Sequence, residues 1–372
     1  MNEIRPLTGI RGIAALTVFL AHTHETLLPK GVDLSIPTLI ERLFLSGGRQ
    51  VDIFFVLSGF ILTLIYSTWF DAGVSRNGYL KFMRKRLARI YPLQAFMLVL
   101  IAGFVIVASF SHAQVANGLE RFSWSTLPLN FLLIHAWGFD KEGGTWNPPS
   151  WSISIEFLAY LLFPFFLWIS TTARKKHRWL LLIAVLACGF SCNAVMFWGQ
   201  AGISGISRGL TEFALGSLCV TFYSSSLADW LRSNLGSTLA LLALLVCYAL
   251  TPGTSFAIAV FAAPLILALT GKNPVSTFFG WAPVYFLGEI SYSIYLGHFL
   301  FTSIAYRLVS MQWMRSGPLG TILGLIFIIA FVLGLSTLTY FAIERPGRDW
   351  LAGQRKGRPI KDFAQTNQRD VS

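Results

Sequence analysis

An apolar run near the start of the chain holds the side chains with the clearest potential for chemistry. The stretch "RPLTGIRGIAALTVFLAHTHE", residues 5–25, suits a membrane helix and yet contains Arg11, His22, His24 and Glu25. An ionisable side chain inside a membrane costs about 2.5 kcal/mol or more, so it indicates a functional site whose partner has to be found. Ten residues separate Arg11 from His22. On a helix this places them roughly 16 Å apart, at different depths of one cavity.

Proton transfer is the chemistry that His22 suits best, because a free imidazole titrates near neutral pH. Glu25 lies one helical turn further along the same face, and Asp52 opens the next apolar segment at the same expected depth. A carboxylate there could hold the imidazole in one tautomer. His24 points to a different face, so we expect it to be a bystander or to have a supporting role, and its substitution serves as a control. For a lone histidine near a helix end, a polar interface residue is the alternative.

A basic stretch, "RKRLARIYP", follows the second apolar segment. Arg86 and Arg89 lie three residues apart on one helix face, with Arg84 beside them. Arginine binds phosphate through charge-assisted, often bidentate hydrogen bonds. The cluster therefore suits either the phosphates of a cytosolic donor or simple anchoring at the inner membrane surface.

Small residues interrupt the second apolar segment, "VDIFFVLSGFILTLIY". The step Ser58-Gly59 lets a neighbouring helix or a flexible ligand approach closely. The strand-turn-helix context of a serine nucleophile is not predicted here. We therefore interpret Ser58 and Gly59 as a path for a ligand, not as a nucleophile site.

Two further apolar segments contain polar residues that need partners. Glu156 lies two turns into "NPPSWSISIEFLAYLLFP", where a hydrogen-bond donor or an arginine is expected, for function or for structure. Trp151 precedes it on a different face and alone resembles an interface anchor. In "LGEISYSIYLGHF", spacings of three place four residues on one stripe, either a polar cavity wall or a set of interhelical hydrogen bonds. They are Glu289, Tyr292, Tyr295 and His298.

The final apolar segment ends in "FAIERP", where Glu344 is followed by Arg345 and Pro346. We expect a local ion pair that ends the helix at the inner surface.

Composition indicates the kind of scaffold that positions these residues. The chain is 54% hydrophobic and 12% charged, whereas soluble domains are roughly a quarter charged. We therefore expect an all-α, polytopic membrane helix bundle of about ten transmembrane helices. The expected spans are residues 10–28, 51–70, 92–110, 150–170, 179–199, 208–223, 235–250, 255–271, 283–306 and 318–343.

The net charge of +12 does not predict a nucleic-acid partner, because the basic residues cluster beside apolar segments. The clusters lie at 76–91, at 174–178 and in the tail that follows residue 345. The bias of Lys and Arg toward cytoplasmic loops then places both termini in the cytoplasm. We expect a transmembrane domain over residues 1–345 and a basic tail over 346–372. Neither a metal site nor a permanently bound cofactor is expected.

Six blocks together resemble the acyltransferase 3 family of bacterial membrane proteins, and they occur in that family's order over nearly the whole chain. The Arg-ten residues-His arrangement is the family's signature. The blocks are "GIRGIAALTVFLAH", "VDIFFVLSGFIL", "RKRLARIYP", "PPSWSISIEFLAYLLFP", "LGEISYSIYLGHF" and "FAIERP".

The resemblance implies an enzyme of the bacterial inner membrane that moves an acyl group, usually acetyl from cytosolic acetyl-CoA, to a hydroxyl of a cell-surface or lipid-linked glycan. His22 would be the essential residue and Arg11 its signature partner. Arg86 and Arg89 would contact the CoA phosphates. Acetyl and larger acyl groups, such as succinyl, both remain open.

Two departures from the family pattern matter. The residue before the first glycine is commonly acidic in the family and is Thr8 here, so any role of that carboxylate is lost or moved. Many members also carry a periplasmic SGNH domain; a chain of 372 residues would complete the transfer itself or pass the acyl group to a separate periplasmic protein. The rival interpretations are a glycolipid transporter without acyl-transfer chemistry and a structural subunit of a glycan assembly complex.

Overall fold

The computed structural model describes residues 3–27, 47–70, 73–110, 122–139, 146–172, 177–196, 201–250, 255–309, 314 and 317–353. Helices make up the regular structure of this part of the chain, and no strand occurs in it. The helices are α1 (Arg5–Leu27), α3 (Val51–Tyr66), α4 (Arg76–Phe110), α5 (Leu127–Phe131), α6 (Trp151–Leu161), α7 (Phe163–Thr172), α8 (Arg178–Met196), α9 (Ala201–Cys219), α10 (Ser226–Leu231), α11 (Asn234–Leu250), α12 (Ser255–Ala268), α13 (Pro274–Gly280), α14 (Ala282–Glu289), α15 (Ser291–Leu308), α17 (Pro318–Thr339) and α18 (Arg345–Ala352).

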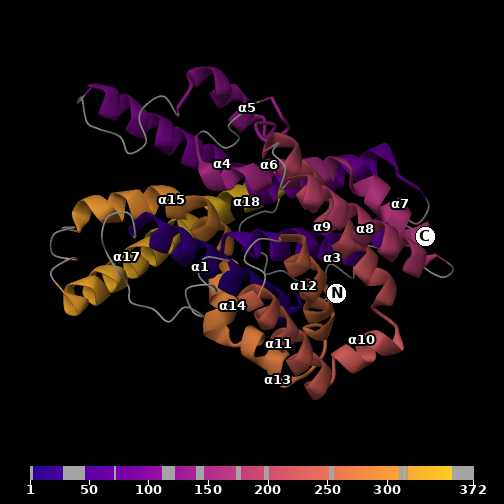
Figure 1. Ribbon diagram of the computed structural model, residues 1–372. Coiled ribbons are helices and arrows are strands. Elements are labelled where there is room, and N and C mark those ends of the chain that lie inside the picture. The colour runs from indigo at the N-terminus through magenta and orange to yellow at the C-terminus, as the bar shows by residue number, and fades with distance from the viewer. Residues whose placement is uncertain are drawn as a thin grey trace.

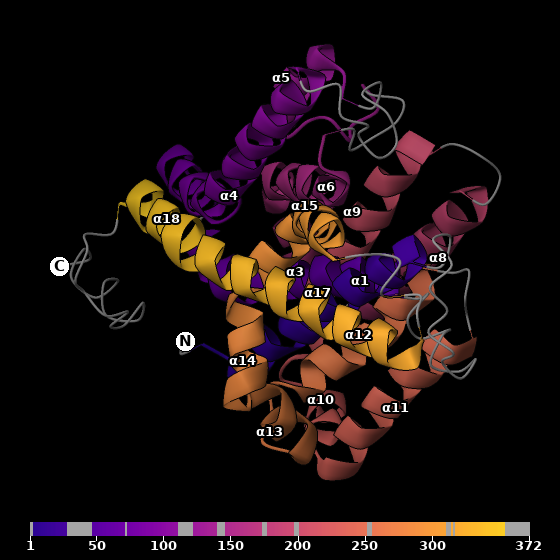
Figure 2. The same cartoon turned by 90° about the vertical axis from the view of Figure 1, so that its left-hand side faces the viewer.

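The helices that carry the candidate residues lie in the middle of the bundle. Helix α1 packs against α3, α14 and α15, with α4 toward one edge of the molecule and α11 and α13 toward the other (Figure 1). In the view turned by 90°, α17 and α18 cross in front of this central group (Figure 2). The all-α prediction is confirmed for the described residues.

Length and composition allow three helical segments to cross a membrane: 47–70, 76–110 and 318–352. A fourth is possible if the pair 148–161 and 163–171, bent by 60°, forms one span. The other apolar helices are shorter. The expectation of about ten spans with both termini in the cytoplasm therefore stays a prediction.

Two expected spans are broken into separate helices. The span 150–170 bends at Leu162, and Pro164, which has no N–H group and restricts the residue before it, lies just beyond the break. The span 283–306 is interrupted at Ile290, where the hydroxyl of Ser291 donates to the Gly288 carbonyl at 2.7 Å and competes with the helical ladder.

The last helix does not end where the sequence suggested. A π-helical turn, Tyr340–Glu344, joins α17 to α18, so the helical segment runs from Pro318 to Ala352. The predicted pair of Glu344 with Arg345 is wrong, because the Glu344 carboxylate turns inward to another arginine, Arg89. The expected domain boundary at residue 345 falls inside this segment.

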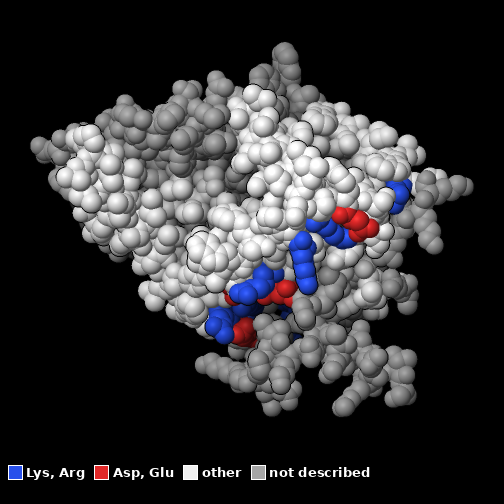
Figure 3. All heavy atoms as spheres, turned by 90° about the horizontal axis from the view of Figure 1, so that it is seen from below, with Lys and Arg blue, Asp and Glu red and all other residues white. Residues whose placement is uncertain are grey.

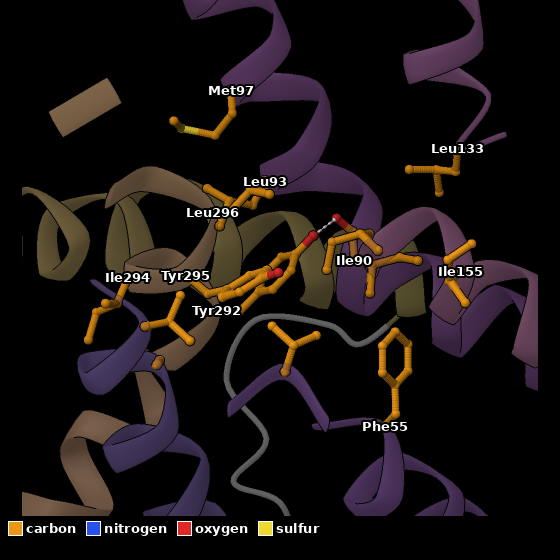
Figure 4. Close-up of a cluster of buried hydrophobic side chains, with 14 of the residues drawn as sticks. Phe55, Ile90, Leu93, Met97, Leu133, Ile155, Tyr292, Ile294, Tyr295 and Leu296 are labelled. Atoms are coloured by element: carbon orange, nitrogen blue, oxygen red, sulfur yellow. Dashed lines mark hydrogen bonds between the residues drawn. The ribbon is translucent and has the colours of Figure 1, made fainter. Parts of the chain in front are cut away.

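Side chains from α3, α4, α6 and α15 meet in the buried core (Figure 4). The hydroxyl of Tyr292 donates to the Ile90 carbonyl at 2.6 Å, a bond between α15 and α4. Phe55 and Ile155 pack in the same cluster. Tyr292 and Tyr295 of α15 are therefore packed against the neighbouring helices by mostly apolar side chains.

Glycines let α3 and α9 approach each other at backbone contact. A Cβ on Gly59 would lie 2.0 Å from the Phe213 carbonyl oxygen, and one on Gly216 would lie 1.9 Å from the Val56 carbonyl oxygen. Such contacts are far inside van der Waals distance, so neither position accepts a side chain without separating the helices. The close approach at Gly59 is thus made by a helix, not by a ligand.

Replacing Gly59 by alanine should destabilise the fold by about 1–3 kcal/mol through overpacking against α9. Gly103→Ala is the matched control, because a Cβ there meets nothing within 4 Å in the described structure. The measurement is the thermal unfolding midpoint of each variant in detergent. Equal midpoints for the two variants would contradict the close packing.

Candidate active site

A cavity of about 650 Å³ lies among α3, α4, α6, α15 and α18. Its lining includes acidic and basic side chains together. The basic ones are Arg11, Lys85, Arg86, Arg89, Arg345 and Arg348, and the acidic ones are Glu3, Glu156, Glu289 and Asp349. Seen from below, charged side chains gather in one band, and the surface above that band is uncharged (Figure 3). A charged cavity beside an apolar surface suits an anionic ligand that enters from a membrane face.

Two of the three arginines from the basic stretch line the cavity. Arg86 donates from Nη2 to the Tyr66 hydroxyl at 3.0 Å. Arg89 donates from Nη1 to Glu344 at 2.6 Å, and the Ser293 hydroxyl donates to the other oxygen of that carboxylate at 2.8 Å. The Arg89 charge is therefore neutralised inside the protein, whereas the hydroxyl of Tyr66 leaves the charge of Arg86 in place.

Arg84 is exposed and lies apart from the cavity lining. Its Nε donates to the Leu351 carbonyl at 2.7 Å, close to the C-terminal end of α18. Arginine at a helix C-terminus satisfies a free carbonyl. The structure therefore gives Arg84 the role of docking α18 onto α4.

Arg11 projects into the cavity from α1. Its Nε is buried without a hydrogen-bond partner, and its side chain makes no ion pair or hydrogen bond with the described residues. Arg11 thus differs from Arg89 in having no direct ion pair among these residues, although it shares the cavity with Glu3, Glu156 and Glu289.

Glu156 lines the same cavity and has found its donors. Its Oε1 accepts from the Ser58 hydroxyl at 3.0 Å and from the Tyr160 hydroxyl at 2.5 Å. Ser58 is therefore in the cavity wall as expected, while Gly59 is not among the lining residues. The other carboxylate oxygen of Glu156 makes no hydrogen bond with the described residues.

A carboxylate, that of Glu3, lies beside Thr8. The Thr8 hydroxyl donates to Glu3 Oε1 at 2.8 Å, and the Tyr285 hydroxyl donates to Glu3 Oε2 at 3.0 Å. Glu3 also lines the cavity. The Glu3 carboxylate is thus held beside Thr8 by two hydroxyl groups.

His22 meets a partner that sequence spacing did not identify. Its Nδ1 lies 3.0 Å from Nε2 of His298, on α15. Glu25 is exposed and makes no hydrogen bond with His22, and Asp52 bonds elsewhere. The expectation that one of these carboxylates orients His22 is wrong for this structure, because the histidine of α15 occupies that position.

The cavity stops about one helical turn short of this histidine pair. Tyr295, one turn before His298 on α15, lines the cavity together with Phe54 and Ser152, whereas neither histidine is among the lining residues. The Tyr295 hydroxyl bonds to the Pro149 carbonyl and to the Ser152 hydroxyl, at 2.9 and 2.8 Å. The rings of Phe54 and Tyr295 lie 5.7 Å apart between centroids, close to the end of the cavity.

Two ionisable residues of α9, Arg208 and Glu212, were missed at the sequence level. Arg208 donates from Nε to Asp52 at 2.7 Å and from Nη2 to the same oxygen, and Glu212 lies 3.6 Å away. Their spacing of four residues inside an apolar segment was the signal that would have found them. The guanidinium also lies 5.5 Å from the centroid of Trp151, which places that ring in the bundle beside an ion pair.

Glu289, at the end of α14, is separated by the helix break from the other three residues of the expected stripe. It accepts a hydrogen bond from the Tyr340 hydroxyl at 3.0 Å. His24 is 3% exposed and lies on α1 away from the pair of His22 and His298. Groups of three or more metal-ligating side chains are absent among the described residues.

The fold and the site define a helical membrane protein whose charged cavity ends one helical turn before the buried His298. A family model described as an acyltransferase domain matches residues 5–341, which is most of the chain. The chain therefore belongs to the acyltransferase 3 family, and it is an acyltransferase.

Curated relatives carry related names. The acyltransferase MdmB of Streptomyces mycarofaciens is 27% identical over 370 residues, covering 91% of this chain and 90% of MdmB. YrhL of Bacillus subtilis, a putative peptidoglycan O-acetyltransferase, is 24% identical over 321 residues, 79% of this chain but 48% of YrhL. The putative O-acetyltransferase SACOL0978 of Staphylococcus aureus is 25% identical over 223 residues, 57% of this chain and 30% of its own. The chain thus spans about half or less of the last two. No solved structure matches.

Proposed function

We propose that the protein transfers an acetyl group from acetyl-CoA to a hydroxyl of a surface glycan or of its lipid-linked precursor. One observation carries the proposal: a cavity of about 650 Å³ with basic side chains leads from the charged band to Tyr295, one helical turn before His298, the hydrogen-bond partner of His22. The names of YrhL and SACOL0978 as putative O-acetyltransferases support acetyl as the group transferred.

The donor end of the cavity supplies the groups that an acyl-CoA needs. Arg86 and Lys85 line it on α4, and Arg345 and Arg348 line it on α18, so the phosphates of CoA would meet several cations. Arg89 is neutralised by Glu344 and would contribute less. The pantetheine arm would then pass Ser58 and Glu156 toward the ring of Tyr295.

The chemical step uses His22 as a general base. Its free ring nitrogen takes the proton of the acceptor hydroxyl, the oxygen attacks the thioester carbonyl, and the carbon–sulfur bond of the tetrahedral intermediate then breaks. The leaving CoA sulfur takes the proton from His22, which returns the imidazole to its neutral form. The thioester has to pass the rings of Phe54 and Tyr295 to reach this position, so a movement of those side chains accompanies binding.

The proposal places the chain in a bacterial inner membrane with about ten spans and both termini in the cytoplasm. Three long apolar helices, one bent pair and the shorter apolar helices 178–192, 234–250 and 256–268 support this arrangement. The basic end of the cavity would then face cytosolic acyl-CoA, and His22 would face the outer half of the membrane.

Arg11→Gln should raise the KM for acetyl-CoA by about 10- to 100-fold, because a hydrogen bond to a charged group contributes roughly 1.5–3 kcal/mol. The effect on kcat should be smaller, since Arg11 lies far below the reacting atoms. Steady-state kinetics with acetyl-CoA measure both constants. An unchanged KM would contradict a role of Arg11 in donor binding.

The test of the function is transfer by the purified protein in detergent. Radiolabelled acetyl-CoA is incubated with a surface polysaccharide or peptidoglycan fraction from cells that lack the gene, and released thiol and alkali-labile label are counted. Equal amounts of both are expected. Protein that binds no acetyl-CoA, and whose loss from cells leaves the acetyl content of both fractions unchanged, would favour the transporter instead.

A further inference from the structure

The hydrogen bond of His298 to its own helix fixes where its proton lies. Nδ1 of His298 is 2.6 Å from the Tyr295 carbonyl oxygen. A carbonyl oxygen can only accept, so Nδ1 carries the proton. His298 is 2% exposed, and its ring makes no hydrogen bond with a carboxylate among the described residues. In a neutral imidazole the other nitrogen, Nε2, is then an acceptor.

The position of the proton on His298 also determines the tautomer of His22, because the two rings share a hydrogen bond. Because Nε2 of His298 accepts, Nδ1 of His22, at 3.0 Å, has to donate. The two rings are parallel within 7° and their centroids are 5.1 Å apart. With two ring atoms at 3.0 Å and the centroids at 5.1 Å, the rings meet edge to edge in nearly one plane, which is the geometry of an N–H···N hydrogen bond.

The nitrogen of His22 that remains unprotonated faces a small residue. A Cβ built on Gly48 would lie 4.0 Å from Nε2 of His22, and that Cβ would meet no other described heavy atom within 4 Å outside its own stretch of backbone. Gly48 belongs to the short 3-10 helix Gly47–Gln50, just before α3. The point left open by the missing Cβ of Gly48 is therefore where a hydroxyl could approach Nε2.

We infer that His298 is a positioning residue, which holds His22 as the Nδ1–H tautomer so that Nε2, beside Gly48, is the atom that accepts the proton. The inference rests on the proposed function, because it names the working nitrogen of the proposed base. During transfer Nδ1–H continues to donate to His298, while Nε2 takes up the hydroxyl proton and later gives it to the CoA sulfur. The proton count on His298 does not change.

Two substitutions at position 298 separate orientation from packing. His298→Leu introduces an apolar side chain of similar size and removes the acceptor, so kcat for acetyl transfer should fall by about 10- to 100-fold. The KM for acetyl-CoA should stay within about twofold, because the donor cavity is lined by other residues. His298→Gln restores an acceptor oxygen near the position of Nε2 and should retain at least about a tenth of the wild-type kcat.

The control is His24→Gln, which alters a buried histidine of α1 outside the pair; it should keep wild-type kcat. Wild-type kcat in a folded His298→Leu variant would overturn the inference, as would a folded His298→Gln variant no more active than His298→Leu. If His22→Ala itself remained fully active, the proposed function would fail first. Inactive His22→Ala beside active His298→Leu would remove the inference alone.

Nitrogen NMR of the wild-type protein gives a readout that needs no activity and does not depend on whether the variants at position 298 fold. In protein labelled with nitrogen-15 in histidine, the resonances missing from His22→Ala identify the ring of interest. Wild-type protein should show Nδ1 of His22 protonated and Nε2 unprotonated. The opposite assignment in folded wild-type protein would disprove the tautomer.

Discussion

His22→Ala is expected to lower acetyl transfer by about 10²–10⁴-fold, the usual contribution of a general base. The His22 imidazole is hydrogen-bonded to His298 through Nδ1, and its Nε2 lies 4.0 Å from the open Cβ position of Gly48. Alanine removes the proton acceptor and leaves His298 without its donor. Binding of acetyl-CoA should be unchanged, because His22 is not part of the cavity lining.

The measurements are the rate of label transfer from radiolabelled acetyl-CoA and the dissociation constant for acetyl-CoA. His24→Gln serves as the matched control from the same turn of α1. A folded His22→Ala variant that transfers acetyl at the wild-type rate would rule out His22 as the base. Loss of acetyl-CoA binding together with activity would place the defect in the fold and not in the chemistry.

Arg208→Leu is expected to destabilise the folded protein by about 3–5 kcal/mol, the cost of breaking a buried ion pair from one side. Asp52 and Glu212 are both 0% exposed, and Arg208 bonds to the first and lies beside the second. Removing the guanidinium leaves the two buried carboxyl groups of Asp52 and Glu212 without their neighbouring positive charge. The bundle should therefore loosen between α3 and α9, the two helices that carry them.

Thermal unfolding in detergent, followed by size-exclusion chromatography, measures this effect. Arg76→Leu is the control, because Arg76 is exposed near the start of α4 and should change stability by no more than about 0.5 kcal/mol. The double variant Asp52→Asn with Arg208→Gln replaces the ion pair by neutral amides and should recover part of the loss. If Arg208→Leu unfolded at the wild-type temperature, the ion pair would contribute nothing to the stability of the folded protein.

Local patterns in the sequence identified the helices and most of the cavity wall. The i, i+3 spacing of Tyr292, Tyr295 and His298 does place them on one buried stripe of α15. The breaks at Leu162 and Ile290 had weaker signals, a proline two residues on and a serine that bonds back to its helix. Counting apolar segments in the sequence detects neither of these helix breaks.

Pairings between distant segments could not be read from spacing. His22 and His298 are 276 residues apart, Asp52 and Arg208 are 156 apart, and Arg89 and Glu344 are 255 apart. Helical periodicity describes which residues share a face of one helix, and it does not say which face of another helix lies opposite. Nearness in sequence favours Glu25 as the partner of His22, whereas the structure pairs His22 with His298, 276 residues away.

The number of residues in the π-helical turn Tyr340–Glu344 sets the direction of the side chains that follow it. A π turn holds one residue more than an α turn, so everything beyond it is rotated by roughly 100° relative to an uninterrupted α-helix. That rotation directs Glu344 to Arg89 and brings Arg345 and Arg348 to the cavity. The register of the final helix thus depends on a single extra residue, and a one-residue deletion there would turn the basic groups of α18 away from the entrance together.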